Sequence, residues 1–250
     1  MLIEHLNPIA FTIGPFKVYW YGIFMAISFL VGVYYLVSAG KKYGYKEETL
    51  LNGVIAVMIS AIVGARLMFV LANYPHWFIS DPIQVFKVYE GGLAWHGGLL
   101  GGLIAGNIYT RKHGLDLARL SDFVVPGLAT GYILVRIGNI FNHEILGRMT
   151  GFWFGRWPAQ PIASLIGLVL LIRYFKVEKK NPPPGYQFWS FIFYHQILRC
   201  LIEETIRENS LFALGYINEF WGIGLFTLTH ITTPFVLLLA YYYIRKSLKQ

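Results

Sequence analysis

The sequence predicts an all-α integral membrane protein, and two observations support that prediction. Of its 250 residues, 56% are hydrophobic, 17% are aromatic and only 14% are charged, a balance that soluble domains of this size do not show. The apolar residues also gather into seven stretches, each close to the roughly 20 residues that a helix needs to cross a bilayer. Because lipid offers no partner for free backbone groups, these stretches should be helices, and none alternates with the period of a membrane barrel.

The predicted spans follow one another with short connections, so we expect a single polytopic membrane domain over residues 1–250. The approximate bounds of the seven spans are 18–38, 50–72, 92–110, 121–141, 159–176, 187–206 and 217–244. The fourth span is the least apolar and could be broken or partly re-entrant. The residues before the first span have no basic region and no cleavage pattern, so this span should be a retained helix rather than a signal peptide. The single cysteine, Cys200, excludes an internal disulfide.

Lysine and arginine are distributed unevenly between the connections, and this asymmetry predicts the orientation. Of the 21 basic residues, 13 follow the first, third, fifth and seventh spans, five lie on the opposite side, and three lie inside spans. We therefore expect the amino terminus outside and the carboxyl terminus in the cytoplasm. The formal net charge of +8 then belongs to a cytoplasmic collar that faces anionic lipid, not to a nucleic-acid surface.

The sixth span carries charged residues that membrane helices normally exclude. His195, Arg199, Glu203 and Arg207 recur every four positions, so in an α-helix they would form one polar stripe about 18 Å long. This stripe could be an ion-pair ladder that ties the span to a neighbouring helix. It could instead form part of a binding site for an anionic group.

The fourth span carries a second polar face, within the stretch LVRIGNIFNHEILGR. Arg136, Asn139 and His143 fall three to four positions apart, and Asn142 and Glu144 flank that face. Two arginine-bearing faces can clamp one dianionic group, because the guanidinium fork matches the oxygens of a phosphate. In a membrane this group would be a phospholipid head, with nearby glutamates holding the arginines in place.

Outside these two faces, polar and aromatic side chains mark three more candidate positions. His96 lies in a glycine-rich run at the third span, where it could be an accessible base or a hydrogen-bonded structural residue. Tyr21 could direct its hydroxyl toward a cavity or belong to an interfacial aromatic belt. Arg66 places a charge inside a third span, the second of the seven, and is therefore a functional candidate. The connection GRMTGFWFGRWPAQP could anchor the protein at the lipid–water boundary or contact a substrate.

Metal and cofactor motifs are missing from the sequence. It contains no HExxH motif, no paired cysteines and no clustered carboxylates with ligand spacing. It also lacks a P-loop and a dinucleotide fingerprint. We therefore expect no metal and no diffusible cofactor.

Two motifs, YEGGLAWHGGLLGG and RIGNIFNHEILGR, resemble the prolipoprotein diacylglyceryl transferases of bacterial plasma membranes. The signatures of that family are a histidine followed by two glycines and an R-x-G-N-x-x-N-x-E-x-x-G-R run. The resemblance extends from IGPFKVYWYG through GARLMFVLANY and SDFVVPG to LRCLIEETIRENS, which is most of the chain. It implies transfer of the diacylglyceryl group of phosphatidylglycerol to the lipobox cysteine of a preprolipoprotein. The products would be a thioether and glycerol 1-phosphate.

The resemblance also implies roles for individual residues. The implied catalytic residues are His96, Arg136, Arg199 and His195. The implied substrate-binding residues are Tyr21, Arg66, Asn139, Asn142, Glu144, Arg148, Glu203 and Arg207. His195 stands where the family has a tyrosine, so either histidine could be the base that takes the thiol proton. Arginines around the leaving phosphate would stabilise its growing negative charge.

Two other functions fit the same polar faces. A divergent relative could use the same phospholipid donor with another acceptor. The stretch RWPAQPIAS keeps Pro158 and Gln160 but lacks the histidine, tyrosine and glutamate that the family usually has there. A lipid transporter or flippase would also need charges within the membrane, although the sequence shows no inverted repeat and no pair of interrupted helices.

Overall fold

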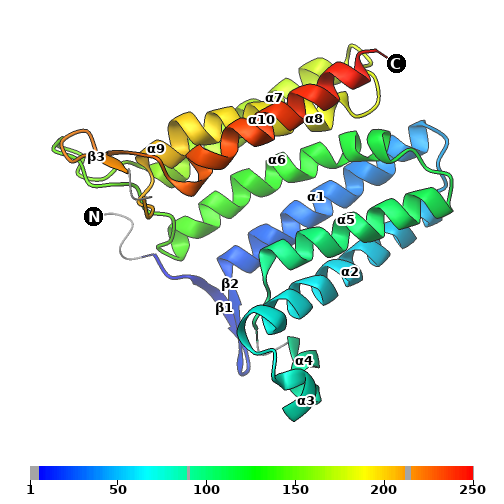
Figure 1. Ribbon diagram of the computed structural model, residues 1–250, viewed down its shortest axis with the longest axis horizontal. Helices are drawn as coiled ribbons and strands as arrows, with labels where there is room; N and C mark the ends of the chain where they lie inside the picture. Colours follow the sequence, from blue (N-terminus) through cyan, green and yellow to red (C-terminus); the bar gives the residue numbers. More distant parts are fainter. Residues whose placement is uncertain (1–5, 89–90, 212–214, 250) are drawn as a thin grey trace. The chain divides into compact units, whose positions relative to one another are not determined.

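The structure is a computed structural model that describes residues 6–88, 91–211 and 215–249. Within these ranges the chain is mostly helical, and it divides into two compact units. Unit 1 contains residues 1–35 and 121–250, and unit 2 contains residues 36–120. The boundaries between the units fall inside two long helices, α1 (Trp20–Lys42) and α6 (Leu117–Phe141) (Figure 1).

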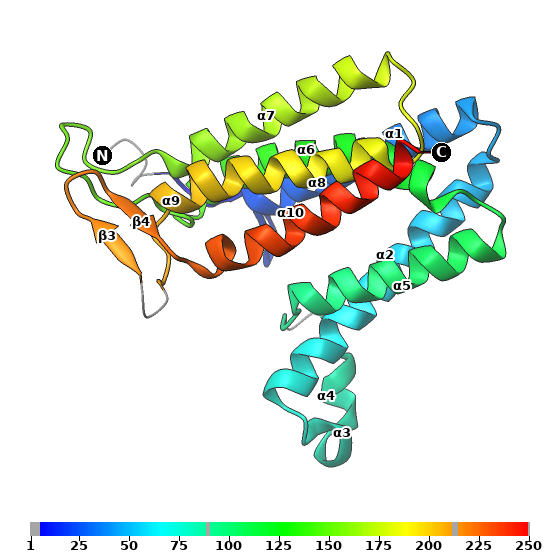
Figure 2. The ribbon, with the colours of Figure 1, turned by 45° about the horizontal axis from the view of Figure 1, so that its top comes forward.

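Unit 1 combines the ends of the chain with every element that follows α6. These elements are β1 (Ile9–Ile13), β2 (Phe16–Tyr19), α7 (Ala159–Glu178), α8 (Tyr186–Leu198), η2 (Arg199–Glu203), α9 (Glu204–Ile206), β3 (Tyr216–Asn218), β4 (Ile223–Leu225) and α10 (Leu228–Ser247). Helices α7 and α10 both pack against α8, as Figures 1 and 2 show. The strands form two antiparallel hairpins, β1–β2 and β3–β4.

The core of unit 1 lies where α6, α7 and α8 meet. Its buried residues are Val125, Ala129, Ile166, Leu170, Tyr174 and Phe191. Polar contacts at the edge of this core fix the position of α8. Asp122, which is only 1% exposed, accepts hydrogen bonds from Gly185 N and Phe188 N, both at 2.8 Å. A carboxylate at the first turn of a helix satisfies free N–H groups and complements the helix dipole.

Unit 2 is a pair of helices, α2 (Glu47–Asn73) and α5 (Trp95–Lys112), joined through the short helices α3 (Trp77–Ser80) and α4 (Pro82–Phe86). The glycine-rich run in α5 lets the two backbones approach closely. A Cβ atom on Gly97 would overlap the carbonyl of Gly64, and one on Gly64 would lie 3.2 Å from Gly101 Cα. This close approach is the packing expected for small residues between membrane helices.

The apolar surface of the helices agrees with a membrane protein. Four described helices, α1, α2, α6 and α7, are long and apolar enough to cross a bilayer. Large apolar side chains on them, including Leu30, Ile59 and Leu165, are more than half exposed, and lipid would cover such a surface. The predicted spans at 92–110, 187–206 and 217–244 correspond to α5, to the run from α8 to α9, and to α10. That these three cross the membrane stays a prediction.

The structure corrects two sequence predictions. Helix α6 is continuous even though it contains Pro126, so the fourth span is not broken. The last helix begins at Leu228 rather than near residue 217, because residues 216–225 form the β3–β4 hairpin. Gly222, with φ of 59°, allows the chain to reverse there. The apolar and aromatic residues of this hairpin have the composition of a helix start, which explains the error.

Replacing Gly127 with alanine should destabilise unit 1, because the new Cβ would overlap Gly32 Cα on α1. The clash is with backbone, so a helix must shift, and such overpacking costs about 1–3 kcal/mol. We expect a lower midpoint of thermal unfolding in detergent. The control is Gly131→Ala on the same helix, where the nearest atom lies 3.6 Å away and alanine favours the helix. Equal midpoints for the two variants would contradict the close packing of α1 on α6.

Candidate active site

A buried ion pair joins α6 to the segment η2. Arg136 Nη2 lies 2.6 Å from Glu203 Oε1, and the two side chains are 10% and 0% exposed. The hydroxyl of Tyr132, one helical turn before Arg136, donates a hydrogen bond to Glu203 Oε2. The Tyr132 ring also lies 5.1 Å from the Arg136 Cζ, as in a cation–π contact. These partners are what a carboxylate needs in an interior of low dielectric constant.

Asn139 extends the contacts of Arg136 to the end of α6. Its Oδ1 accepts a hydrogen bond from Arg136 Nη1 at 3.3 Å, and its Nδ2 donates to Glu144 Oε2 at 2.9 Å. Glu144 N donates back to Asn139 O at 2.9 Å after a turn in which His143 has φ of 56°. Gln160 on α7 then donates to Glu144 O at 2.8 Å. Arg136, Asn139 and Glu144 of the signature run therefore form one connected network with Gln160.

The segment η2 is a π-helix, and it changes which side chains of the sixth predicted span meet. Glu204 N donates to Arg199 O, five residues back, so the turn holds one more residue than an α-helical turn. The stripe with a spacing of four, expected from the sequence, is therefore interrupted at Arg199. Glu203 pairs with Arg136, whereas Glu204 Oε2 lies 4.0 Å from Arg199 Nε.

Arg148 lies where the connection after α6 meets the end of α9. Arg148 N donates to Ile206 O at 2.7 Å, and a β-bridge joins the same connection to Arg207. Arg148 Nη2 donates to Asn209 O at 2.9 Å, and Asn209 Nδ2 donates to Glu204 Oε1 at 2.7 Å. These bonds attach Arg148 and Arg207 to the chain segment that carries Glu203 and Glu204.

Four arginines of unit 1 present buried donor atoms without a hydrogen-bond partner in the described part of the chain. We call them the arginine cluster, and the atoms are the Nε of Arg136, Arg148, Arg199 and Arg207. Burial lowers the pKa of the Arg207 guanidinium, and the carboxylates of Glu203 and Glu204 oppose that shift. Four guanidinium groups beside these two carboxylates leave an excess of positive charge. An anionic group with several oxygen atoms suits such a donor set.

Three other predicted site residues contact the helix that carries Arg136. The ring of His195 meets Tyr132 edge to face, with centroids 4.5 Å apart. Tyr21 on α1 packs against Gly138, where a Cβ would lie 3.1 Å from Tyr21 Cδ2. Asn142 donates its backbone N–H to Gly138 O at 3.1 Å. Gly138 thus allows α1 to approach the signature run closely.

The remaining predicted site residues, His96 and Arg66, belong to unit 2. His96 is the second residue of α5 and is exposed, with its ring edge to face against Trp95 at 5.3 Å. Arg66 is 5% exposed. Its guanidinium donates to four backbone carbonyls, those of Gln84, Val85, Gly91 and Gly92. Tyr89 and Glu90, which begin the motif around His96, lie outside the described residues.

Sequence reasoning did not select four residues that the site network contains. They are Tyr132, Gln160, Glu204 and Asn209. Tyr132 stands four residues before Arg136, so helical spacing could have identified it. Glu204 could not be found this way, because its pairing with Arg199 depends on the π turn.

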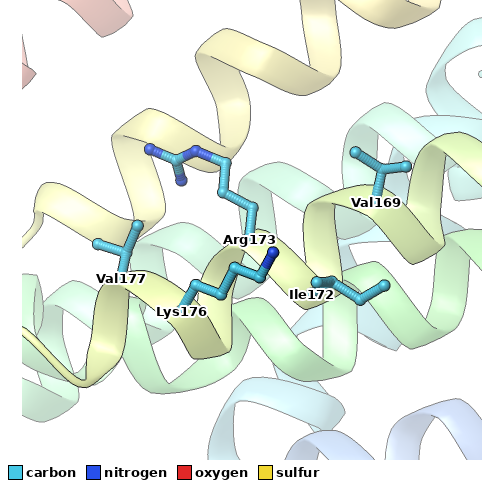
Figure 3. Close-up of a pocket in the computed structure, with 5 residues that line it drawn as sticks. All are labelled: Val169, Ile172, Arg173, Lys176 and Val177. Atoms are coloured by element: carbon cyan, nitrogen blue, oxygen red, sulfur yellow. The ribbon is translucent and has the colours of Figure 1, made fainter.

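A surface pocket of unit 1 lies away from this network. Its lining residues are Val169, Ile172, Arg173, Lys176 and Val177, all on α7 (Figure 3). None of them is a predicted site residue. The candidate active site is instead identified by its buried polar contacts.

Comparison with known proteins identifies the family. The family model for prolipoprotein diacylglyceryl transferase matches residues 8–244. The chain belongs to the prolipoprotein diacylglyceryl transferase family. This finding confirms the resemblance seen in the two sequence motifs.

Named relatives match almost the whole chain. The phosphatidylglycerol–prolipoprotein diacylglyceryl transferase of a Thermoanaerobacter species is 60% identical over 248 residues, which cover 99% of this chain and 96% of the relative. The protein of that name from Caldanaerobacter subterraneus is 59% identical over 248 residues, with the same coverage. The one from Thermus thermophilus is 30% identical over 268 residues, covering 94% of this chain and 96% of the relative.

Replacing Glu203 with glutamine should destabilise the protein strongly, because Arg136 would lose its buried counter-charge. Removing one partner of a buried pair costs about 3–5 kcal/mol. The matched control is Glu208→Gln, since Glu208 pairs with Arg156 at the surface, where a pair contributes about 0–1 kcal/mol. Unfolding in detergent micelles measures both effects. If both variants unfold like the wild type, the pair between Arg136 and Glu203 does not hold α6 to η2.

Proposed function

We propose that this protein transfers the diacylglyceryl group of phosphatidylglycerol to the lipobox cysteine of a preprolipoprotein. The thiol becomes a thioether, and glycerol 1-phosphate is released. The main support is the arginine cluster, with its excess positive charge and four buried donors that lack a partner within the described ranges. The chain is also 60% identical to a named phosphatidylglycerol–prolipoprotein diacylglyceryl transferase.

The proposal includes the cellular setting. The enzyme would lie in the bacterial inner membrane as one polytopic domain with seven spans and an external amino terminus. The four apolar helices and the uneven distribution of basic residues support this setting. Its partners would be phosphatidylglycerol and signal peptides that carry a lipobox cysteine, with no role for nucleic acid.

In this proposal the arginine cluster binds the phosphate of the donor lipid. The thiolate attacks the glycerol carbon, the carbon–oxygen bond breaks, and the phosphate diester becomes a monoester with one more negative charge. Arg136 and Arg199 would stabilise that charge in the transition state more than in the ground state. Their orientation is set before the substrate binds, because Glu203 and Glu204 lie beside them. The other substrate contacts would be Tyr21, Asn139, Asn142, Glu144, Arg148, Glu203 and Arg207.

A histidine would supply the base. A cysteine thiol with an ordinary pKa near 8.5 must lose its proton before it attacks an unactivated carbon. His96 is exposed at the start of α5 and followed by two glycines, so its ring is accessible to a thiol or a bridging water. His195 is the second candidate, because its ring adjoins Tyr132 and thereby the buried ion pair. No step of this reaction calls for a metal or a diffusible cofactor.

The first test uses purified protein in phosphatidylglycerol micelles with a synthetic lipobox peptide. We expect the peptide to gain the mass of a diacylglyceryl group while glycerol phosphate is released in equal amount. A peptide with serine in place of cysteine should stay unmodified. Arg199→Gln should lower the rate by about 10²- to 10³-fold, the usual effect of removing one charge-stabilising donor. Arg199 is the suitable arginine to change, because its side chain is 32% exposed and the fold depends on it less.

Other outcomes of this assay would contradict the proposal in different ways. Glycerol phosphate released without peptide modification would indicate another acceptor for the same donor. No release and no modification, from folded protein, would favour binding or transport of lipid.

Two histidine variants distinguish the candidate bases. His96→Gln should lower kcat by about 10²- to 10⁴-fold, because a general base contributes that much. His195→Tyr should retain activity, because a tyrosine hydroxyl keeps an aromatic polar group beside Tyr132. The measurement is the rate of peptide modification at saturating lipid. An inactive but folded His195→Tyr variant, together with an active His96→Gln variant, would assign the base to His195.

A further inference from the structure

Arg66 uses almost all of its donor groups on its own chain. Its Nε donates to Val85 O at 3.0 Å, and its Nη2 donates to Gln84 O at 2.6 Å. Its Nη1 donates to Gly91 O at 2.6 Å and to Gly92 O at 3.2 Å. A guanidinium has five N–H groups, so among the described residues one is left without a hydrogen-bond partner. A bidentate contact with a phosphate needs two neighbouring free N–H groups, and Arg66 does not have them.

We infer that Arg66 is a positioning residue that fixes the start of α5, and with it His96. The four carbonyls belong to two short stretches. Gln84 and Val85 lie in α4, whereas Gly91 and Gly92 lie in the approach to α5. One buried guanidinium therefore joins the end of α4 to the segment that leads into His96. Figure 2 shows α4 and the start of α5 at the same end of α2.

The neighbours of Arg66 on α2 complete this attachment. Ala94 N donates to Ala65 O at 2.9 Å. A Cβ on Gly97 would overlap the carbonyl of Gly64, so α5 touches the α2 backbone there. Three consecutive residues of α2 thus contact the chain on both sides of His96. The backbone of His96 is held in place, while its side chain stays exposed.

The glycines before His96 match this arrangement. Gly91 and Gly92 have φ of 87° and 73°, a backbone that L side chains rarely adopt. A Cβ on Gly92 would lie 2.7 Å from Arg66 Nη1 and would also overlap the ring of Phe69. The rings of Phe69 and Trp77 lie 5.6 and 5.9 Å from the Arg66 Cζ. The guanidinium is therefore enclosed. It cannot change position unless the turn at Gly91 and Gly92 also moves.

Lysine cannot reproduce these contacts. Its ammonium group is a single nitrogen with three donors, whereas Arg66 reaches four carbonyls from three separate nitrogens. Arg66→Lys keeps the charge, but it should still detach the turn at Gly91 and Gly92 from α2. If Arg66 bound the phosphate through charge alone, lysine would retain part of its effect.

The test is a double-mutant cycle in the full-length protein, and it rests on the proposed role of His96 as the base. Arg66→Lys should lower kcat about 100-fold, because a displacement of about 1 Å at a catalytic group costs that much. The KM for phosphatidylglycerol should stay within a small factor. In the His96→Gln background, Arg66→Lys should cause no further loss, since a residue that acts only through His96 has nothing left to position. Arg111→Lys, an exposed arginine on α5, is the control and should change neither constant.

Two kinetic results would overturn the inference. One is a full additional loss for Arg66→Lys in the His96→Gln background. The other is a large rise in the KM for phosphatidylglycerol with kcat unchanged. Either would show that Arg66 acts on the reaction independently of His96.

Amide hydrogen exchange supplies a readout that needs no activity. In Arg66→Lys, amides of residues 84–98 should exchange faster than in the wild type, while those of α6 and α7 stay unchanged. Unchanged exchange at residues 84–98 would overturn the positioning role even if the transfer reaction is confirmed. Faster exchange in a protein without transfer activity would contradict the proposed function. It would still support the role of Arg66 in fixing the start of α5.

Discussion

The pairing of Arg136 with Glu203 is the constraint on which the arrangement of unit 1 depends. An ionised side chain within apolar helices is tolerated only when it is paired and hydrogen-bonded. The two side chains are almost fully buried, and they come from helices that are far apart in the sequence. Their pairing therefore fixes how α6 and η2 face each other, and the contacts of Tyr132 and Asn139 follow from it. Removing one partner would leave the other as an unpaired buried charge.

The π turn in η2 converts this structural pair into a site for an anion. One extra residue in the turn directs Glu203 to Arg136 and sets Glu204 near Arg199. The two carboxylates thus pair with Arg136 and Arg199, and they are too few to neutralise the four guanidinium groups of the arginine cluster. The Nε atoms of the cluster are buried and have no hydrogen-bond partner among the residues that the structure describes. Donors that are already oriented stabilise developing charge without the cost of rearrangement, which is how such sites lower a reaction barrier.

The sequence predicted those features that follow from simple periodicity. Long apolar runs placed α1, α2, α6 and α7 within a few residues of their observed bounds, because length and apolarity decide a membrane helix. Spacing of three to four brought Arg136 and Asn139 onto one helical face, where they are hydrogen-bonded. The same rule would have identified Tyr132.

Other features depend on interactions that no spacing rule encodes. The pairing of Glu204 requires the π turn, and that turn has no signature in the residue types around it. The partners of Arg66 are backbone carbonyls, which every residue carries, so the sequence could not reveal them. The β3–β4 hairpin escaped prediction because its apolar residues resemble the start of a helix. Tertiary contacts outweigh local propensity in each case.

The measurement that tests the central claim most directly is a structure of the protein with phosphatidylglycerol bound. The account predicts that phosphate oxygens lie about 2.7–2.9 Å from guanidinium nitrogens of the arginine cluster, as in charge-assisted hydrogen bonds. At least one of the Nε atoms of Arg136 and Arg199 should then have gained a partner. A phosphate bound elsewhere, with the arginine cluster and its ion pairs unchanged, would contradict the account.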